Sequence, residues 1–285
     1  MSGIERILKL KEEKKPILSL EHLPYLFEVI TNFLKANNKS HFLSNEELLI
    51  MIEIKESKYP YFLKISDEFM DFGSGKIESA NIIIIIDLKT ISDLIFGRLE
   101  AIIAIFSEKI KFIGDLYKLL SYLEIFYSSL DYSNILKKEE RSIPIEIKEM
   151  KELLEVYYIG SSIGEPYHIS SFLTLLSLFA NHCHHGQEQI SGKDVIICLN
   201  ITDVGDYTIK IFNNKLTWEH GTPKKLTLKI VSNLSDFIDV IINGDTVTSY
   251  MAGNLKLEGE NAIPDSMFFQ ELTEKYLDFF GLGKF

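Results

Sequence analysis

In the first half of the chain, apolar residues recur first at helical spacing and then at every second position. Leu23, Leu26, Phe27 and Ile30 share one face of an amphipathic helix, which we expect at residues 20–36. Alternation of apolar and polar residues then predicts strands with one buried face. The strands expected in this half are 48–55, 61–66, 69–72, 80–86 and 109–113, with a short helix from Leu88 and a closing helix at 116–130.

The same series of elements repeats in the second half. Residues 61–65 (YFLKI) align with residues 207–211 (YTIKI), an offset of 207 − 61 = 146. This offset also places Ile50 on Ile196, and self-similarity that keeps one register over a long stretch indicates a duplicated unit. The elements expected in this half are a helix at 169–182, strands at 194–201, 206–212, 215–218, 226–231 and 254–258, a short helix from Leu234 and a C-terminal helix.

The repeat predicts two α+β domains, at residues 18–132 and 169–285, joined by a connecting segment at residues 133–168. A chain of 285 residues is long enough for two domains that each bury a core. The connecting segment begins polar and charged, and then contains a helix or a strand at 146–159. The sequence leaves open whether this piece packs on the second domain or bridges the two.

Charge and composition narrow the classes of partner. The net charge of −11 argues against nucleic acid, because phosphate binding needs clustered lysine and arginine. The most hydrophobic stretch, residues 82–86, is far shorter than the roughly 20 residues of a bilayer span, and charges interrupt the N-terminal region before a signal-peptide core could form. Cys183 and Cys198 do not make a disulfide framework. We therefore expect a cytoplasmic protein without stable membrane insertion.

Two signature segments follow the fourth expected strand of each half. In the first half residues 87–100 read DLKTISDLIFGRLE and residues 106–115 read FSEKIKFIGD; in the second, residues 234–245 read LSDFIDVIINGD and residues 251–260 read MAGNLKLEGE. This pattern resembles the sterol carrier protein domain, and the resemblance covers about residues 18–132 and 169–280. The sequence departs from the family pattern at Glu108, where glycine is common, and at Gly259-Glu260, which replaces Gly-Asp.

The resemblance implies both a fold and a function. Each domain would be a curved, mostly antiparallel five-stranded sheet covered on one face by helices, with an apolar tunnel between the layers. The tunnel would bind and transfer an apolar small molecule: a fatty acyl chain, acyl-CoA, a sterol or an isoprenoid. The resemblance implies no cofactor and no catalysis.

Strand alternation then selects the side chains that would face such a tunnel. Lys64 and Lys210 point outward, so their neighbours on either side point inward. The candidate lipid-binding residues in the first half are Tyr61, Leu63, Ile65, Met70, Phe72, Ile82, Ile84, Ile86, Ile110 and Phe112. Those in the second half are Tyr207, Ile209, Ile211, Leu216, Trp218, Leu226, Leu228, Ile230, Leu255 and Leu257.

Two other functions compete with lipid binding. A scaffold or dimerisation module is favoured if bulky side chains such as Phe72 and Trp218 fill the tunnel themselves. An esterase would use Ser162, since residues 160–164 (GSSIG) match G-x-S-x-G, but Pro166 follows where a helix should already have begun.

The sequence offers little for metal or cofactor chemistry. His182, His184 and His185 cluster with Cys183, but a structural zinc site needs four ligands and no second pair lies nearby. No glycine-rich phosphate motif is present. We therefore expect no catalytic residue, no metal and no cofactor.

Overall fold

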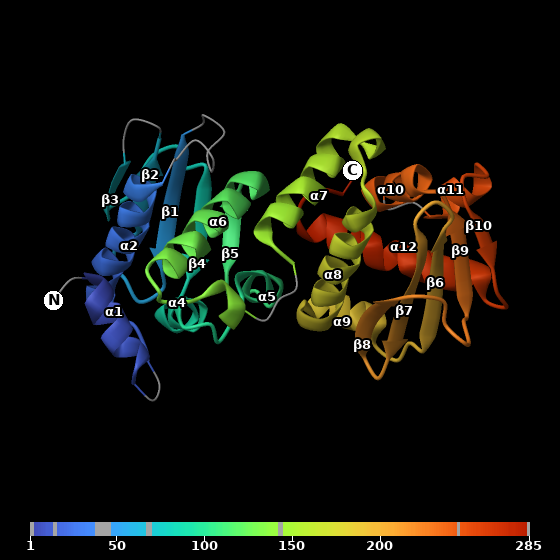
Figure 1. Cartoon of the computed structure of the whole chain (residues 1–285), viewed down its shortest axis with the longest axis horizontal. Helices are drawn as coiled ribbons and strands as arrows, with labels where there is room; N and C mark the ends of the chain where they lie inside the picture. The colour runs from blue at the N-terminus through green and yellow to red at the C-terminus, as the bar shows by residue number, and fades with distance from the viewer. Residues whose placement is uncertain are drawn as a thin grey trace. The chain divides into compact units, whose positions relative to one another are not determined.

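The computed structural model describes residues 3–13, 16–37, 47–66, 70–141, 145–243 and 246–283. The chain forms two compact units, residues 1–147 and 148–285, which we call the N-terminal unit and the C-terminal unit. Figure 1 shows that each unit contains one sheet with helices packed on it. Their boundary falls within the segment expected to connect two domains.

In the N-terminal unit, α2 and α6 contact each other and lie on the same face of the sheet (Figure 1). Apolar residues of α2 that share one helical face are buried there, as the spacing predicted. The helices are α1 (Gly3–Lys11), η1 (Leu20–His22), α2 (Leu23–Ala36), α4 (Leu88–Ile95), α5 (Ala101–Phe106), α6 (Leu116–Tyr132) and η2 (Lys138–Glu140). The strands are β1 (Leu48–Ile54), β2 (Tyr61–Ile65), β3 (Met70–Ser74), β4 (Ile82–Ile86) and β5 (Lys111–Gly114).

The sheet of the N-terminal unit has the strand order β3-β2-β1-β4-β5. Strand β1 pairs parallel with β4, and the other three pairings are antiparallel. The α+β class and the five strands are confirmed. The sheet is mixed because the chain crosses from β3 to the other side of β1, where β4 runs parallel to β1. Phe69, the first residue of the expected strand 69–72, lies outside the described residues.

The C-terminal unit has the strand order β8-β7-β6-β9-β10, which is the same order when its elements are counted from its own first strand. Its first two α-helices, α7 and α8, are joined by a hydrogen bond that the Tyr167 hydroxyl donates to the Glu152 carboxylate (3.0 Å). The helices are α7 (Ile147–Ile159), η3 (Ser161–Ile163), α8 (Pro166–His182), α9 (His184–Ile190), α10 (Leu234–Asn243), α11 (Thr246–Met251) and α12 (Ala262–Phe279). The strands are β6 (Val195–Ile201), β7 (Gly205–Phe212), β8 (Lys215–His220), β9 (Leu228–Ser232) and β10 (Lys256–Glu258).

One correction concerns residue register. Ile50 pairs with Leu63 and with Ile82, and the corresponding residue between Ile209 and Leu228 is Ile197 rather than Ile196. The offset is therefore 147 within β1 and β6 and 146 in the strands around them. A shift of one residue moves every side chain to the other face, so the expected alignment of Ile50 with Ile196 was wrong for this strand.

One polar contact recurs at equivalent places in both units. The backbone N–H of Leu88, at the start of α4, donates to the Glu56 carboxylate (3.0 Å), and that of Leu234, at the start of α10, donates to Asp203 (2.9 Å). Both carboxylates come from the turn after the unit's first strand. They satisfy helix N–H groups that have no partner within the helix.

Glycine is required at the end of β5. Gly114 has φ +121°, and a Cβ at this position would collide with the backbone carbonyl oxygen of Asn81. Gly259 has φ +138° and the same relation to the carbonyl oxygen of Thr227. At both places the last edge strand approaches the start of its neighbour too closely for any side chain.

Candidate functional site

A cavity of about 50 Å³ lies in the N-terminal unit between the sheet and its helices. The floor is formed by β1 and β4, where Ile52 pairs with Ile84 and Ile54 with Ile86, so that all four side chains share one face. The rest of the lining comes from the helices and from the residue before β5. These residues are Leu23, Leu26 and Phe27 from α2, Ile91 and Leu94 from α4, Ile105 from α5, Ile110, and Leu119, Tyr122, Leu123 and Phe126 from α6.

Three of the strand residues expected to face a tunnel line this cavity: Ile84, Ile86 and Ile110. Leu63, Ile65 and Ile82 are fully buried, but they belong to the surrounding core and not to the lining. The helical contribution was not expected. Its signal was present in the apolar spacing of residues 23–34 and 116–130, which marks the faces that pack on the sheet.

The aromatic residues on β2 and β3 pack beside the cavity. The ring of Phe27 stacks on Tyr61 (5.9 Å between ring centroids) and on Phe72 (5.4 Å). Tyr61, Phe72, Met70 and Phe112 are half-buried. The space between α2 and strands β2 and β3 is therefore filled by the side chains of Phe27, Tyr61 and Phe72.

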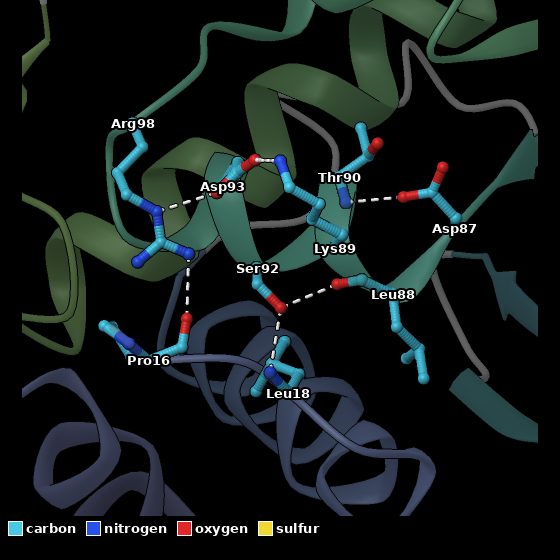
Figure 2. Close-up of polar contacts among 9 residues, drawn as sticks. All are labelled: Pro16, Leu18, Asp87, Leu88, Lys89, Thr90, Ser92, Asp93 and Arg98. Atoms are coloured by element: carbon cyan, nitrogen blue, oxygen red, sulfur yellow. Dashed lines mark hydrogen bonds and ion pairs between the residues drawn. The ribbon is translucent and has the colours of Figure 1, made fainter. Parts of the chain in front are cut away.

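A network of hydrogen bonds holds the α4 wall of the cavity to the segment that leads into α2 (Figure 2). The backbone N–H of Leu18 donates to Ser92 Oγ (2.8 Å), and Ser92 Oγ donates to the carbonyl of Leu88 (2.6 Å). Arg98 donates from Nη2 to the carbonyl of Pro16 (2.8 Å) and from Nε to Asp93 (2.7 Å). The network fixes the two helices that supply five lining residues.

Asp93 is the charged centre of this network. Partial burial raises the pKa of its carboxyl, but hydrogen bonds from Lys89 (2.8 Å) and Arg98 outweigh that effect and hold the pKa below its ordinary value. Asp87, at the N-cap of α4, likewise accepts from the N–H of Thr90 (2.7 Å). Both carboxylates therefore stabilise α4 and its surroundings, and their positions need no catalytic role.

Glu100, the last residue of the signature segment 87–100, also makes contacts that hold the fold together. Glu100 is buried and forms an ion pair with Arg141 (3.5 Å), whose guanidinium lies over the ring of Tyr127 at 4.1 Å. The Tyr127 hydroxyl accepts a hydrogen bond from the backbone N–H of Ala101 (2.9 Å). Burial raises the pKa of Tyr127, so the phenol stays protonated. These residues fasten the start of α5 to α6 and to the segment after it.

In the C-terminal unit, most of the expected inward-facing residues are core. Leu226 is the exception: 38% of it is exposed, because it lies in the bend before β9 begins at Leu228. Trp218 and Leu257 are half-buried. The buried members of the expected set are Tyr207, Ile209, Ile211, Leu216, Leu228, Ile230 and Leu255.

The other sequence candidates fall in structural positions. Ser162 lies in a single turn between α7 and α8, so no strand precedes it as a nucleophile elbow requires. His184 and His185 are exposed and both contact Glu188. No group of three or more metal-ligating side chains comes together among the described residues. Gly244 and Asp245, at the end of one signature segment, lie outside those residues.

None of the helices in the described ranges combines the length and the hydrophobicity that a bilayer crossing requires. No model of a known protein family matches the chain, and no curated protein does.

Solved structures with partial similarity exist. A UbiJ-SCP2 ubiquinone synthesis protein is 11% identical, with a TM-score of 0.34, covering 39% of this chain and 96% of the other. Sterol carrier protein 2 from Yarrowia lipolytica, in its apo form, is 19% identical, with a TM-score of 0.31, covering 38% and 91%. The sec-alkylsulfatase Pisa1 from Pseudomonas sp. is 17% identical, with a TM-score of 0.29, covering 59% and 24%. Scores of this size assign neither family nor function.

Proposed function

We propose that this protein binds the apolar part of a small molecule, such as a lipid, in the cavity of the N-terminal unit, and that it does so without catalysis. The observation that carries the proposal is the lining: fourteen of its fifteen side chains are aliphatic or phenylalanine, and the last is a tyrosine. Sites for apolar ligands are hydrophobic in this way, with very few polar groups. The sterol-carrier-like residue pattern of the sequence agrees with it.

The size of the cavity limits what enters it without a change in the protein. One water-sized group needs roughly 10–15 Å³ of such space, so 50 Å³ holds only a few groups of that size. Pockets for drug-sized ligands measure about 300–1,000 Å³. We therefore propose that a short apolar segment of the ligand occupies the cavity as it stands, and that a longer chain enters by moving side chains of α4 and α6.

We propose further that the C-terminal unit is a second copy of the same binding fold. The identical strand order and the equivalent contacts of Glu56 and Asp203 support a duplication. Transfer of the ligand, its exact class and the location of the protein in the cytoplasm belong to the same proposal.

A scaffold with a self-filled interior is the second candidate. The small cavity volume and the stack of Phe27 on Tyr61 and Phe72 favour it. In that case the apolar interior would serve stability alone, and no small molecule would bind.

Native mass spectrometry of the freshly purified full chain separates the two. Lipid binding predicts reproducible adducts, at most one per unit, which organic extraction and lipid analysis then identify. A bare mass that stays bare after incubation with fatty acids, acyl-CoA and isoprenoid alcohols at high micromolar concentration would refute lipid binding and support the scaffold.

A further inference from the structure

One lining residue of the cavity differs from the other fourteen. Tyr122, on α6, carries the only polar side-chain atom among them, and only 7% of the residue is exposed. Its ring packs against that of Phe126, another lining residue, with 6.1 Å between the ring centroids. The phenol is therefore part of the cavity wall.

The Tyr122 hydroxyl has no hydrogen-bond partner among the residues that the structure describes. Burial alone raises its pKa far above the ordinary value, so the hydroxyl keeps its proton and is a donor. The hydroxyl is not one of the fully enclosed polar atoms that lack a partner, so part of its surface stays accessible, and among the described lining residues it is the one polar side-chain group that an occupant could reach. Tyr127, on the same helix, shows the usual arrangement, because its hydroxyl accepts the N–H of Ala101.

We infer that the Tyr122 hydroxyl donates a hydrogen bond to an oxygen atom of the ligand. The ligand is then a neutral molecule with an apolar body and a carbonyl, ester, ether or hydroxyl oxygen. No charged side chain lines the cavity among the residues that the structure describes, and an ionised carboxylate would lose its hydration there without an opposite charge. This inference rests on the proposed function, and it adds the chemical class of the group that enters the cavity.

The test is a cycle of two proteins and two probes on the full chain. The proteins are the wild type and Tyr122→Phe, and the probes are 2-pentanone and n-pentane, which differ by a carbonyl in place of one methylene. Amide chemical shifts of lining residues in two-dimensional NMR give each dissociation constant. The variant should weaken 2-pentanone by about threefold to tenfold, the value of one neutral hydrogen bond, and leave pentane unchanged.

Each other outcome has one meaning. If the wild type binds neither probe, the proposed function fails and the inference fails with it. If both probes bind and Tyr122→Phe changes them equally, the cavity binds apolar molecules but the hydroxyl does not select an oxygen, and only the inference is overturned.

The folded state gives an independent check. Tyr122→Phe should unfold at about the same urea concentration, because it removes a hydroxyl that bonds to no described residue. Tyr127→Phe should unfold at a lower one, because it leaves the N–H of Ala101 unpaired. Equal losses in the two variants would mean that the Tyr122 hydroxyl is already satisfied within the protein, and would overturn the inference.

Discussion

Replacing Ile84 with phenylalanine should fill the cavity of the N-terminal unit. Ile84 lies on β4, lines the cavity and keeps 5% of its surface exposed, whereas Ile82, two residues earlier on the same face, is fully buried and outside the lining. Ile82→Phe is therefore a matched control: the chemical change, the strand and the face are the same, and only the space in front of the side chain differs.

The expected energies follow from the cavity volume. At about 24 cal/mol per Å³, a cavity of 50 Å³ costs the folded state about 1.2 kcal/mol, which is the most that filling it could recover. Ile84→Phe should therefore change the free energy of unfolding by between about 0 and +1 kcal/mol. Ile82→Phe has no free space and should lose about 1–3 kcal/mol through overpacking.

Urea unfolding followed by circular dichroism measures both variants, and titration with 2-pentanone measures binding. Ile84→Phe should abolish binding while the fold stays as stable as the wild type. If Ile84→Phe is destabilised as much as Ile82→Phe, the cavity is not an accessible space in the folded protein. If binding survives at full strength, the ligand binds elsewhere.

Three further predictions concern stability. Gly114→Ala should lower the free energy of unfolding in urea by about 3 kcal/mol or more, because it combines positive-φ strain with a collision between the new Cβ and the carbonyl oxygen of Asn81. Gly75→Ala is the control: with φ +135° and open space around it, it should cost only the strain, about 1–3 kcal/mol, and equal losses in the two variants would exclude the collision. Burial lowers the pKa of His168 on α8, so the neutral imidazole should contribute fully to the free energy of unfolding above about pH 6.5, and this contribution should fall as the pH drops through the lowered pKa. Urea midpoints at about pH 7 and pH 5 should therefore differ in the wild type and come closer together in His168→Gln. Asp93→Asn should lose roughly 1 kcal/mol at neutral pH. That loss should be complete above the ordinary carboxyl pKa of 3.8 and should disappear as the pH falls through the lowered pKa of Asp93; an equal loss at neutral and strongly acidic pH would contradict this sign.

The sequence was sufficient for most strands because they are short apolar or alternating runs rich in β-branched residues. Residues 82–86 bury every second side chain, residues 207–211 leave only Lys210 outside the buried set, and both segments form strands where expected. Helix α9 was not expected, because residues 184–190 (HHGQEQI) lack apolar periodicity. It exists because Gly186 lets its backbone approach Phe179 and Ala180 at a distance that no Cβ would permit.

The cavity was harder to predict than the sheet. Register with the alternating residues 226–230 identifies Ile82, Ile84 and Ile86 as equally inward-facing, but only the last two line the cavity. Whether buried side chains meet or leave a gap depends on how α4 and α6 sit over the strands, and a gap of 50 Å³ is a small mismatch in packing. The partnerless hydroxyl of Tyr122 is equally invisible, since its sequence neighbours are those of an ordinary amphipathic helix.

The parallel pairing of β1 with β4 has a consequence for how each unit reaches its native state. Ile50 and Ile82 are 82 − 50 = 32 positions apart, so the central pair forms only after a loop of that size has closed. Loop closure of this kind slows the search, whereas the hairpin β2–β3 closes locally. We expect the rate-limiting barrier to lie at this closure, so conservative truncations at Ile50 or Ile82 should slow refolding while truncations in β3 chiefly speed unfolding. On the ribosome, the first sheet would then wait for β4 and not for the end of the chain.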